Sequence, residues 1–390
     1  MKLNYKRLGD YIQQIDVRNK DEKVMRLLGV SIDKKFIESI ANTIGTDMST
    51  YKIVKHGQFA YGPVTSRNGD KVSIALLLEE ECIISSSYTV FEITDTKKLL
   101  PEYLNLWFKR PEFDRYARFH SHGSAREIFD WEEMCNVELP VPPIEEQEKI
   151  VDAYQKIEKR IALKRKLNDN LEAQIHTHYK ELFLSTTDLL RDLPYNWELK
   201  QLKDCGLDIS DGNYSTKYPR YSEFQKSGIP FVRGTDFKGK YISTKNVLYI
   251  SLKKHRELLK GHTKKNDILM STRGEIGKIA FIPDNLVDCN INSQLVRLNG
   301  NGVIPRVYLA FSLLSQPVRD EIKSLITGSV QEQLPIGKLL EIHLLIPDNA
   351  TLNRFVRCSE PILDTILKNE QEVASLENLS IIILETISSR

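Results

Sequence analysis

The sequence lacks the features that mark membrane and secreted proteins. No apolar run approaches the length that crosses a bilayer, and the residues after Met1 do not form the apolar core of a signal peptide. The five cysteines are dispersed, odd in number and never spaced as C-x-x-C, which argues against both a disulfide framework and a zinc site. We therefore expect a soluble, cytoplasmic protein.

Recognisable catalytic motifs are missing as well. The nearest match to a phosphate-binding loop, Gly234–Lys240, has Tyr241 where a Ser or Thr should hold magnesium, and a strand pattern follows it instead of a helix. His120 and His122 have the spacing of a metal-binding pair, but the sequence shows no third ligand nearby, so a loop facing solvent or phosphate is favoured. No amino-methyltransferase tetrapeptide (Asn-Pro-Pro-Tyr or Asp-Pro-Pro-Tyr) occurs. The sequence thus predicts no active site.

A long helical pattern is the feature around which the chain is organised. It begins in the stretch 139–150, where Pro142 and Pro143 suit the first turn of a helix and the glutamates that follow suit the positive end of its dipole. Apolar residues then recur at steps of three and four to about Leu184, which corresponds to a rod of roughly 60 Å at about 1.5 Å per residue. Because such a helix is only half apolar, it needs a partner helix along its apolar stripe.

An internal duplication supplies that partner. An offset of 205 residues places Gly123 on Gly328 and the pair Leu171-Glu172 on Leu376-Glu377, and the match holds through loop and helix alike. This period is far longer than a solenoid repeat, so it implies two copies of a domain followed by a helix. The predicted order is a domain at 1–141, a long helix at 142–185, a domain at 186–346 and a second long helix at 347–390.

Both domains mix helices and strands. In the second long helix, Pro361 predicts either a kink or a fresh start with Ser359 as its cap. A short strand and turn open the first domain at 5–17. The remaining predicted elements are strands at 27–32, 50–54, 74–78, 82–86, 88–93, 137–141, 197–202, 228–234, 266–274, 276–282 and 290–298, and helices at 101–118 and 307–325.

The net charge of +2 hides a difference between the two domains. Residues 194–345 contain 22 Lys or Arg against 15 Asp or Glu, whereas residues 1–141 contain 20 against 21. The second domain is therefore basic and the first is balanced. Lysine clusters of this density are more often solvated surface than a nucleic-acid site, so charge alone does not identify DNA binding.

Over essentially its full length the chain resembles the specificity subunit of a type I restriction-modification system. The stretch 139–150 is similar to the family's helix junction, although at the second junction Leu352 stands in the place of Gln147 and the acidic run is missing. Stretches similar to the family's target-recognition domains lie at 211–215, 228–233, 266–277 and 327–329, and more loosely at 7–10, 19, 85–90 and 123–124.

The resemblance implies an α+β architecture in which two mixed α/β target-recognition domains are separated by two long helices. These helices pair as an antiparallel coiled coil with a pseudo-twofold internal repeat. Each domain would read one part of a bipartite DNA target, and the helices would fix the gap between the half-sites. The subunit itself would carry no chemistry. Two adenine methyltransferase subunits and the motor-nuclease restriction subunits would be its partners, and S-adenosylmethionine, ATP and magnesium would belong to them.

Candidate DNA contacts are polar, aromatic or cationic residues on predicted loops, where donors and acceptors can reach bases or phosphates. Each is about as consistent with ordinary loop surface, and the two tyrosines also with packing beneath a loop. The candidates are Arg18, Asn19, Tyr61, Arg67, Asn68, Ser124 and Arg126 in the first domain and Tyr214, Ser215, Lys217, Arg220, Arg233, Arg273 and Gln331 in the second. The candidates for partner binding are Pro143, Glu145, Glu146 and Gln147.

Two other functions stay open from the sequence. One is the recognition subunit of a different multisubunit DNA modification enzyme, which would have the same architecture but other partners. The other is a coiled-coil scaffold that does not bind DNA. Salt dependence separates the second from DNA recognition, because binding through phosphates weakens steeply as salt rises.

Overall fold

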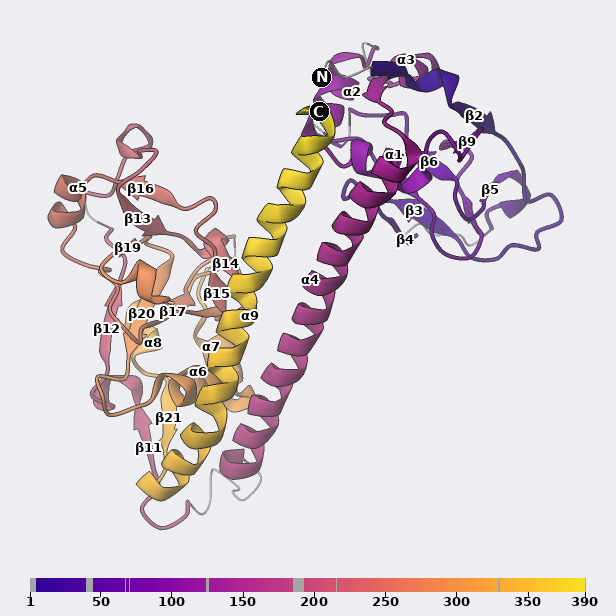
Figure 1. Cartoon of the computed structure of the whole chain (residues 1–390). Helices are drawn as coiled ribbons and strands as arrows, with labels where there is room; N and C mark the ends of the chain where they lie inside the picture. Colours follow the sequence, from indigo (N-terminus) through magenta and orange to yellow (C-terminus); the bar gives the residue numbers. More distant parts are fainter. Residues whose placement is uncertain are drawn as a thin grey trace. The chain divides into compact units, whose positions relative to one another are not determined.

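The computed structural model describes residues 5–39, 45–66, 68–69, 71–123, 126–184, 193–214, 216–328 and 330–389 (Figure 1). The chain divides into two compact units. Unit 1 comprises Met1–Arg160 and Leu376–Arg390, and unit 2 comprises Ile161–Ser375. Each unit therefore contains one mixed domain together with a part of both long helices, and the predicted limits at 141, 185 and 346 stay a prediction.

Unit 1 is built on a four-stranded antiparallel sheet of order β2-β9-β6-β7, with the pairs β1-β10, β3-β4 and β5-β8 beside it in the same unit. Its helices are α1 (Pro101–Phe108), α2 (Pro111–Phe119) and α3 (Trp131–Asn136). Its strands are β1 (Tyr5–Arg7), β2 (Ile12–Ile15), β3 (Leu28–Val30), β4 (Phe36–Glu38), β5 (Lys52–Val54), β6 (Phe59–Tyr61), β7 (Ile74–Leu76), β8 (Cys82–Ile84), β9 (Thr89–Ile93) and β10 (Glu138–Pro140).

Unit 2 repeats this plan with a four-stranded sheet of order β12-β20-β17-β18 and the pair β11-β21. It adds the three-stranded sheet β16-β13-β19, the hairpin β14-β15 and the helix α5 (Leu252–Glu257); its other helices are α6 (Arg306–Leu314), α7 (Gln316–Leu325) and α8 (Ile336–Leu339). Its strands are β11 (Glu198–Gln201), β12 (Asp208–Asp211), β13 (Ile229–Val232), β14 (Phe237–Lys238), β15 (Tyr241–Ile242), β16 (Leu248–Ile250), β17 (Ile268–Ser271), β18 (Ile279–Phe281), β19 (Asn290–Ile291), β20 (Leu295–Asn299) and β21 (His343–Ile346).

The duplication is visible in matching hydrogen bonds. The Tyr103 hydroxyl donates to the Pro140 carbonyl oxygen at 3.1 Å, and the Tyr308 hydroxyl donates to that of Leu345. Tyr308 lies 205 residues after Tyr103, and Leu345 lies 205 residues after Pro140, which is the offset found in the sequence. Tyr103 and Tyr308 are almost fully buried, so each needs a partner for its hydroxyl, and in both units the carbonyl next to the long helix provides it. The repeat is therefore one of three-dimensional structure as well as of sequence.

The two long helices are α4 (Ile144–Tyr179), which continues through a π-helical turn at Lys180–Leu184, and α9 (Asn349–Ser389). Within unit 2, His178 of α4 contacts Ser359 of α9 and Asn168 contacts Asn369, so residue numbers rise along one helix as they fall along the other. The helices are thus antiparallel, as Figure 1 shows. None of the helices in the described ranges combines the length and the apolar character needed to span a bilayer.

A buried polar layer interrupts the apolar seam of this helix pair. Asn168 and Asn369 are each 5% exposed, and the Asn369 amide donates to the Asn168 side-chain oxygen at 2.8 Å. Asn168 in turn donates to Glu370 at 2.7 Å, and Lys164 donates to the Asn369 side-chain oxygen at 2.7 Å. Because any shift along the seam would leave these groups buried without partners, the layer fixes the register of α4 against α9.

Three predicted elements were wrong in their extent. The helices predicted at 101–118 and 307–325 are each two helices, because Pro111 and Pro317 lie in the first turn of a new one. The strand predicted at 290–298 is divided between two sheets, with β19 parallel to β13 and β20 antiparallel to β12 and β17. The fresh helix start at Pro361 was also wrong, since α9 passes through Pro361 and Ser359 is fully buried against His178.

Asp348 caps the start of α9, and its removal should be measurable. Its carboxylate accepts hydrogen bonds from the Thr351 hydroxyl (2.7 Å) and backbone N–H (3.0 Å), from the Trp197 indole (2.9 Å) and from the Ala350 N–H (2.9 Å), which together lower the pKa of Asp348 to about 2. We expect Asp348→Ala to lower the free energy of unfolding of unit 2 by about 1–2 kcal/mol at neutral pH, as for other lost helix caps.

The pH dependence gives the control for this prediction. A carboxyl whose pKa is lowered by folding contributes stability above its unfolded pKa and loses that contribution as the pH falls through the folded value. The difference between wild type and Asp348→Ala should therefore shrink between about pH 4 and pH 2. Urea unfolding of both proteins across this range measures it, with the exposed Asp169→Ala on α4 as the matched variant. A pH-independent difference would show that the charge of the cap is irrelevant.

Candidate nucleic-acid interface

In both units the tip of a hairpin is joined to a glycine-containing loop, and we call this arrangement the hairpin–loop junction. In unit 1 it comprises the β6-β7 tip (62–73) and the loop 120–129, where the Thr65 N–H donates to the Glu127 carbonyl at 2.9 Å. In unit 2 it comprises the β17-β18 tip (272–278) and the loop 326–334, where the Leu334 N–H donates to the Thr272 carbonyl at 2.9 Å. Backbone hydrogen bonds thus hold each loop against its hairpin.

The loop of each junction turns at a glycine. Gly123 has a φ of +132° and Gly328 a φ of +95°, which L-residues rarely adopt. A Cβ atom would lie 2.1 Å from the carbonyl oxygen of Arg126 in the first loop and 2.5 Å from that of Gln331 in the second. Only glycine fits there, so both positions serve backbone geometry.

The junction of unit 1 borders a hollow of about 330 Å³ that is open to solvent. Asn68 and Arg126, two of the predicted DNA contacts, line it from opposite sides of the junction. Arg126 is exposed, and its side chain makes no hydrogen bond or ion pair within the described part of the chain. Sequence reasoning missed Ser73, Ser87 and Tyr88, which line the same hollow, because only the folded sheet brings these segments next to Asn68.

The junction of unit 2 carries an aromatic and a cationic side chain in contact. The Arg273 guanidinium lies 5.4 Å from the centre of the Tyr214 ring, and the Tyr214 hydroxyl donates to the Ser293 carbonyl oxygen. Tyr214 keeps 53% of its surface exposed, and its partial burial raises its pKa, which keeps the hydroxyl protonated. Arg273 also pairs through its backbone with Gln333, two residues after the predicted contact Gln331. The segments that carry Tyr214, Arg273 and Gln333 are far apart in sequence and thus meet here.

The family model for the type I restriction modification DNA specificity domain matches residues 34–173 and 194–377 of this chain. The chain belongs to this specificity family. Two curated relatives from Methanocaldococcus jannaschii are the type I restriction enzyme MjaIX specificity subunit, 25% identical over 296 residues, and the MjaVIII specificity subunit, 23% identical over 290 residues. The matches cover 72% and 70% of this chain, and 66% and 65% of those proteins, slightly less than two thirds of their length.

A solved structure shows the same fold across the whole chain. The S subunit of a type I restriction-modification system from M. genitalium superposes with a TM-score of 0.59 at 12% sequence identity, covering 99% of this chain and 96% of that one. The two domain repeats of the specificity family and its two long helices are therefore present here. This confirms the family and the fold class predicted from the sequence.

Two of the predicted DNA contacts, Asn19 and Tyr61, are corrections because their side chains are buried and serve the fold, and a third, Arg233, has a partner within the protein. Asn19 is 1% exposed, and its amide exchanges hydrogen bonds with the backbone of Val24. Tyr61 is fully buried in the aromatic core, where burial raises its pKa. Arg233 forms an ion pair of 3.0 Å with Asp236, a carboxylate that is itself buried. Asn19 and Tyr61 thus present no polar group to a base or phosphate, whereas the Arg233 side chain keeps 31% of its surface exposed and stays a candidate.

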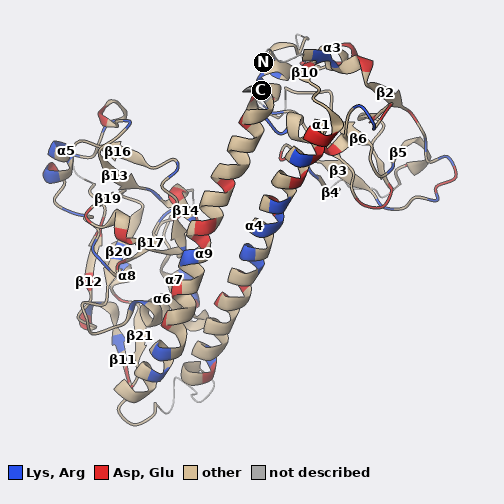
Figure 2. Ribbon diagram, in the orientation of Figure 1, with Lys and Arg blue, Asp and Glu red and all other residues tan. Residues whose placement is uncertain are grey.

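The other predicted contacts lie at the surface or outside the described residues. Arg18 is partly exposed and is held by Asp16 at 2.7 Å, whereas Lys217, Arg220 and Gln331 are exposed. Lys217 lies beside α5, since its carbonyl accepts from Lys254, and Figure 2 shows that α5 is largely basic. The candidates Arg67, Ser124 and Ser215 lie outside the described residues.

The four residues predicted to bind partners differ in their exposure. Pro143 and Glu145 are exposed at the start of α4 and Glu146 is partly exposed, so these three stay candidates. Gln147 is a correction, because it is fully buried and holds the start of α4 to the segment before α1. Its side chain accepts from the Leu100 N–H at 2.9 Å and donates to the Lys98 and Pro142 carbonyls at 2.8 Å each.

The two motifs considered for ligand chemistry differ in outcome. The segment Gly234–Lys240 forms a 3₁₀ turn and the β14 strand, and Lys240 pairs with Glu172 at 2.9 Å, so it has no phosphate-loop geometry. His120 and His122 do have an acidic neighbour that the sequence did not reveal. Glu133 of α3 lies 3.1 Å from His120 and 3.9 Å from His122, so both rings lie beside a carboxylate.

Proposed function

We propose that this chain is the DNA target-recognition subunit of a type I restriction-modification complex and that each unit reads one half of a bipartite target through its hairpin–loop junction. The observation that carries this proposal is the repetition of one backbone arrangement with different polar side chains. Asn68 and Arg126 border the junction of unit 1, whereas Tyr214 and Arg273 occupy that of unit 2. A shared framework with unlike side chains suits the reading of two unlike sequences.

The chemistry of these side chains fits the reading of base edges. Arginine donates two parallel hydrogen bonds to guanine, and asparagine exchanges two with adenine in the major groove. The tyrosine ring beneath Arg273 holds the guanidinium in place without neutralising it, because the cation–π contact leaves the N–H groups available. The basic α5 is suited to phosphates, which position a protein on DNA without specifying sequence.

The partners and cofactors of the chain follow from the same proposal. Two adenine methyltransferase subunits would dock on this chain, with the exposed start of α4 around Pro143 and Glu145 as one contact surface, and restriction subunits would join them. S-adenosylmethionine, ATP and magnesium would be bound by these partners, and this chain would be a non-catalytic component of a cytoplasmic complex. A recognition subunit of another multisubunit DNA modification enzyme is the alternative, and the identity of the methyltransferase that copurifies with the chain distinguishes the two.

A genome-wide map of modified adenines tests the proposal. Cells that co-express this chain with its methyltransferase should contain a modified motif of two short half-sites separated by a fixed gap, and cells with the methyltransferase alone should lack it. Purified complex should bind DNA with an affinity that falls steeply as salt rises. A soluble complex with neither a motif nor salt-dependent DNA binding would favour a scaffold.

Single arginine variants assign each junction to one half-site. Arg126→Ala and Arg273→Ala should each weaken DNA binding by about 1–3 kcal/mol, roughly 5- to 150-fold, if the arginine contacts a base. Each variant should relax one half of the motif and leave the other unchanged. Arg319→Ala, which removes an exposed arginine from α7, is the matched control and should alter neither half. Equal weakening on all sequences would instead assign the arginine to phosphate contact.

A further inference from the structure

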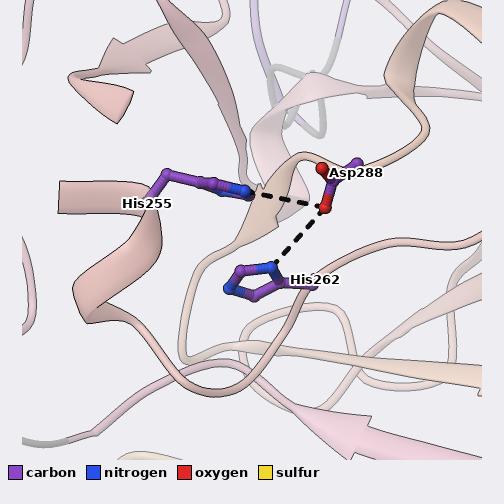
Figure 3. A group of neighbouring side chains, drawn as sticks. All are labelled: His255, His262 and Asp288. Atoms are coloured by element: carbon purple, nitrogen blue, oxygen red, sulfur yellow. Dashed lines mark ion pairs between the residues drawn. The ribbon is translucent and has the colours of Figure 1, made fainter. Parts of the chain in front are cut away.

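Two histidines and an aspartate in unit 2 converge on one point at the end of α5 (Figure 3). His255 comes from α5, His262 from the segment that follows it, and Asp288 from the loop before β19. One oxygen of Asp288 lies 3.6 Å from Nε2 of His255 and 3.6 Å from Nδ1 of His262. The three ligand atoms all lie within 4.8 Å of one another.

These separations are too long for hydrogen bonds and suit a bound metal ion. A nitrogen and an oxygen that share a hydrogen bond lie about 2.7–3.2 Å apart. Two ligands of one tetrahedral zinc ion, at metal–ligand distances of about 2.0–2.2 Å, lie roughly 3.4 Å apart. Both nitrogen–oxygen distances in the cluster are close to the second value.

The far side of each imidazole ring is held by an oxygen atom. Nδ1 of His255 lies 2.6 Å from the side-chain oxygen of Asn290, and Nε2 of His262 contacts the Leu258 carbonyl oxygen. Because these oxygens accept hydrogen bonds, the nitrogens facing them carry the protons. In the neutral form of each ring, the other nitrogen has a lone pair that faces Asp288. Metal-binding histidines in proteins usually have this outer hydrogen bond.

The backbone holds the three residues in place before any ligand binds. The Asp288 N–H donates to the Thr263 carbonyl at 2.8 Å, and the Thr263 N–H donates to the Cys289 carbonyl at 2.9 Å, so the segments carrying His262 and Asp288 are paired. Ser251 caps α5, which carries His255. His255 is buried, whereas the Asp288 side chain is 75% exposed, so the cluster has a rigid inner side and an open outer one.

We propose that His255, His262 and Asp288 bind a divalent transition metal ion, with Zn²⁺ as the best match, and that water takes the fourth position on the open side. Two imidazoles and a carboxylate with an open fourth position are a ligand set that zinc adopts. Cys289 does not take part, because its thiol is buried and donates to the Leu286 carbonyl. The ion would join α5 and its following segment to the loop before β19.

Metal titration of the purified full-length chain tests this site. After chelator treatment, Zn²⁺ should bind with one-to-one stoichiometry in competition with a chromophoric chelator, and Co²⁺ should give the visible absorption of a tetrahedral site. His262→Gln and Asp288→Asn should each lower the affinity by more than about 100-fold, since even the loss of an outer-shell partner costs about 10- to 100-fold. Affinity should also fall as the pH is lowered and the histidines become protonated.

Matched variants separate this cluster from the other histidines. His120→Gln and His122→Gln remove the pair beside Glu133 in unit 1 and should leave zinc binding unchanged. Circular dichroism of the metal-free His262→Gln and Asp288→Asn proteins checks that both fold. Zinc that raises the melting temperature of wild type but not of these variants supports the proposal. Absence of binding by the wild type, or equal binding by the folded variants, would overturn it and leave the cluster as an ion-pair group.

Discussion

Gln147→Leu is expected to lower the free energy of unfolding of unit 1 by about 2–5 kcal/mol. The substitution retains most of the side-chain volume but removes three hydrogen bonds at a fully buried position. The Leu100 N–H and the carbonyls of Lys98 and Pro142 would lose their partners, and each buried group left unsatisfied costs about 1–3 kcal/mol. Hydrogen exchange measured by mass spectrometry should show faster exchange around Leu100 and the start of α4, with unit 2 unchanged.

In unit 2 the start of the long helix is held to its domain without an equivalent glutamine. At the 205-residue offset, Leu352 replaces Gln147 and Pro305 replaces Leu100. Proline has no N–H, so the donor that Gln147 satisfies in unit 1 does not exist in unit 2. Leu100 has a φ of −80°, close to the value that proline requires, and Leu100→Pro therefore suits its backbone.

The double variant Gln147→Leu, Leu100→Pro is the matched control. It removes the Leu100 N–H that the single variant leaves without a partner. The free energy of unfolding of unit 1 should therefore be about 1 kcal/mol or more higher than in Gln147→Leu alone. No recovery, together with a small effect of the single variant, would show that water replaces the lost hydrogen bonds. Because Gln147 is buried, any loss of methyltransferase binding in Gln147→Leu should follow unfolding of unit 1, whereas Glu145→Ala should affect binding without changing stability.

The sequence predicts the long elements well because their signals are local and repeated. The prolines and glutamates at 142–146 mark the start of α4, and the apolar period follows the helix to its end at Leu184. The 205-residue offset predicts the second copy, and the paired tyrosine hydrogen bonds confirm it. These features require no knowledge of which distant segments meet.

Site residues were harder to predict, because a polar residue on a loop often uses its polar atoms within that loop. Asn19 and Arg233 have the chemistry of base readers, yet Val24 and Asp236 occupy their hydrogen-bonding groups. Nothing in the sequence distinguishes them from Arg126, which lies exposed at the edge of a hollow. That distinction depends on tertiary contacts.

The histidine cluster was missed for a related reason. Its ligands come from a helix, a turn and a loop, and their spacing of 7 and 26 residues follows no metal-binding signature. The single strand predicted at 290–298 also gave a wrong path for the chain in this region. In the structure the chain turns at Asn292, whose side-chain oxygen accepts from the Gln294 N–H, and this turn separates β19 from β20. Backbone pairing of Thr263 with Asp288 and Cys289 places Asp288 beside His262, and the contact of His255 with Asn290 brings in the third residue.

Arg297→Met should be among the most destabilising single changes in unit 2, at about 3–5 kcal/mol near neutral pH. Arg297 is 6% exposed on β20, a central strand of the four-stranded sheet of unit 2. Its guanidinium donates two hydrogen bonds to Asp208, at 2.8 and 3.1 Å. It also lies 3.6 Å from Asp267, which is fully buried and whose pKa is raised by that burial. Methionine fills a similar volume but removes the cation beside the buried Asp267 and leaves Asp208 with Lys264, at 2.7 Å, as its remaining cationic partner.

The sign of the pH dependence separates this effect from simple packing loss. Hydrogen bonds from Arg297 lower the pKa of Asp208, and a carboxyl whose pKa is lowered by folding contributes stability above its unfolded pKa and loses it as the pH falls through the folded value. The deficit of Arg297→Met should therefore be largest at neutral pH and shrink below about pH 4, as the carboxylates that face Arg297 become protonated. Arg306→Met, which removes a more exposed arginine from its pairs with Glu360 and Asp364, should cost less than about 1 kcal/mol. Urea unfolding of the three proteins at pH 7 and pH 4 measures both effects, and a pH-independent deficit would assign the loss to packing around Arg297. This dependence has the same direction as that expected at Asp348, because Arg297 lowers the pKa of Asp208 just as hydrogen bonds lower the pKa of the cap.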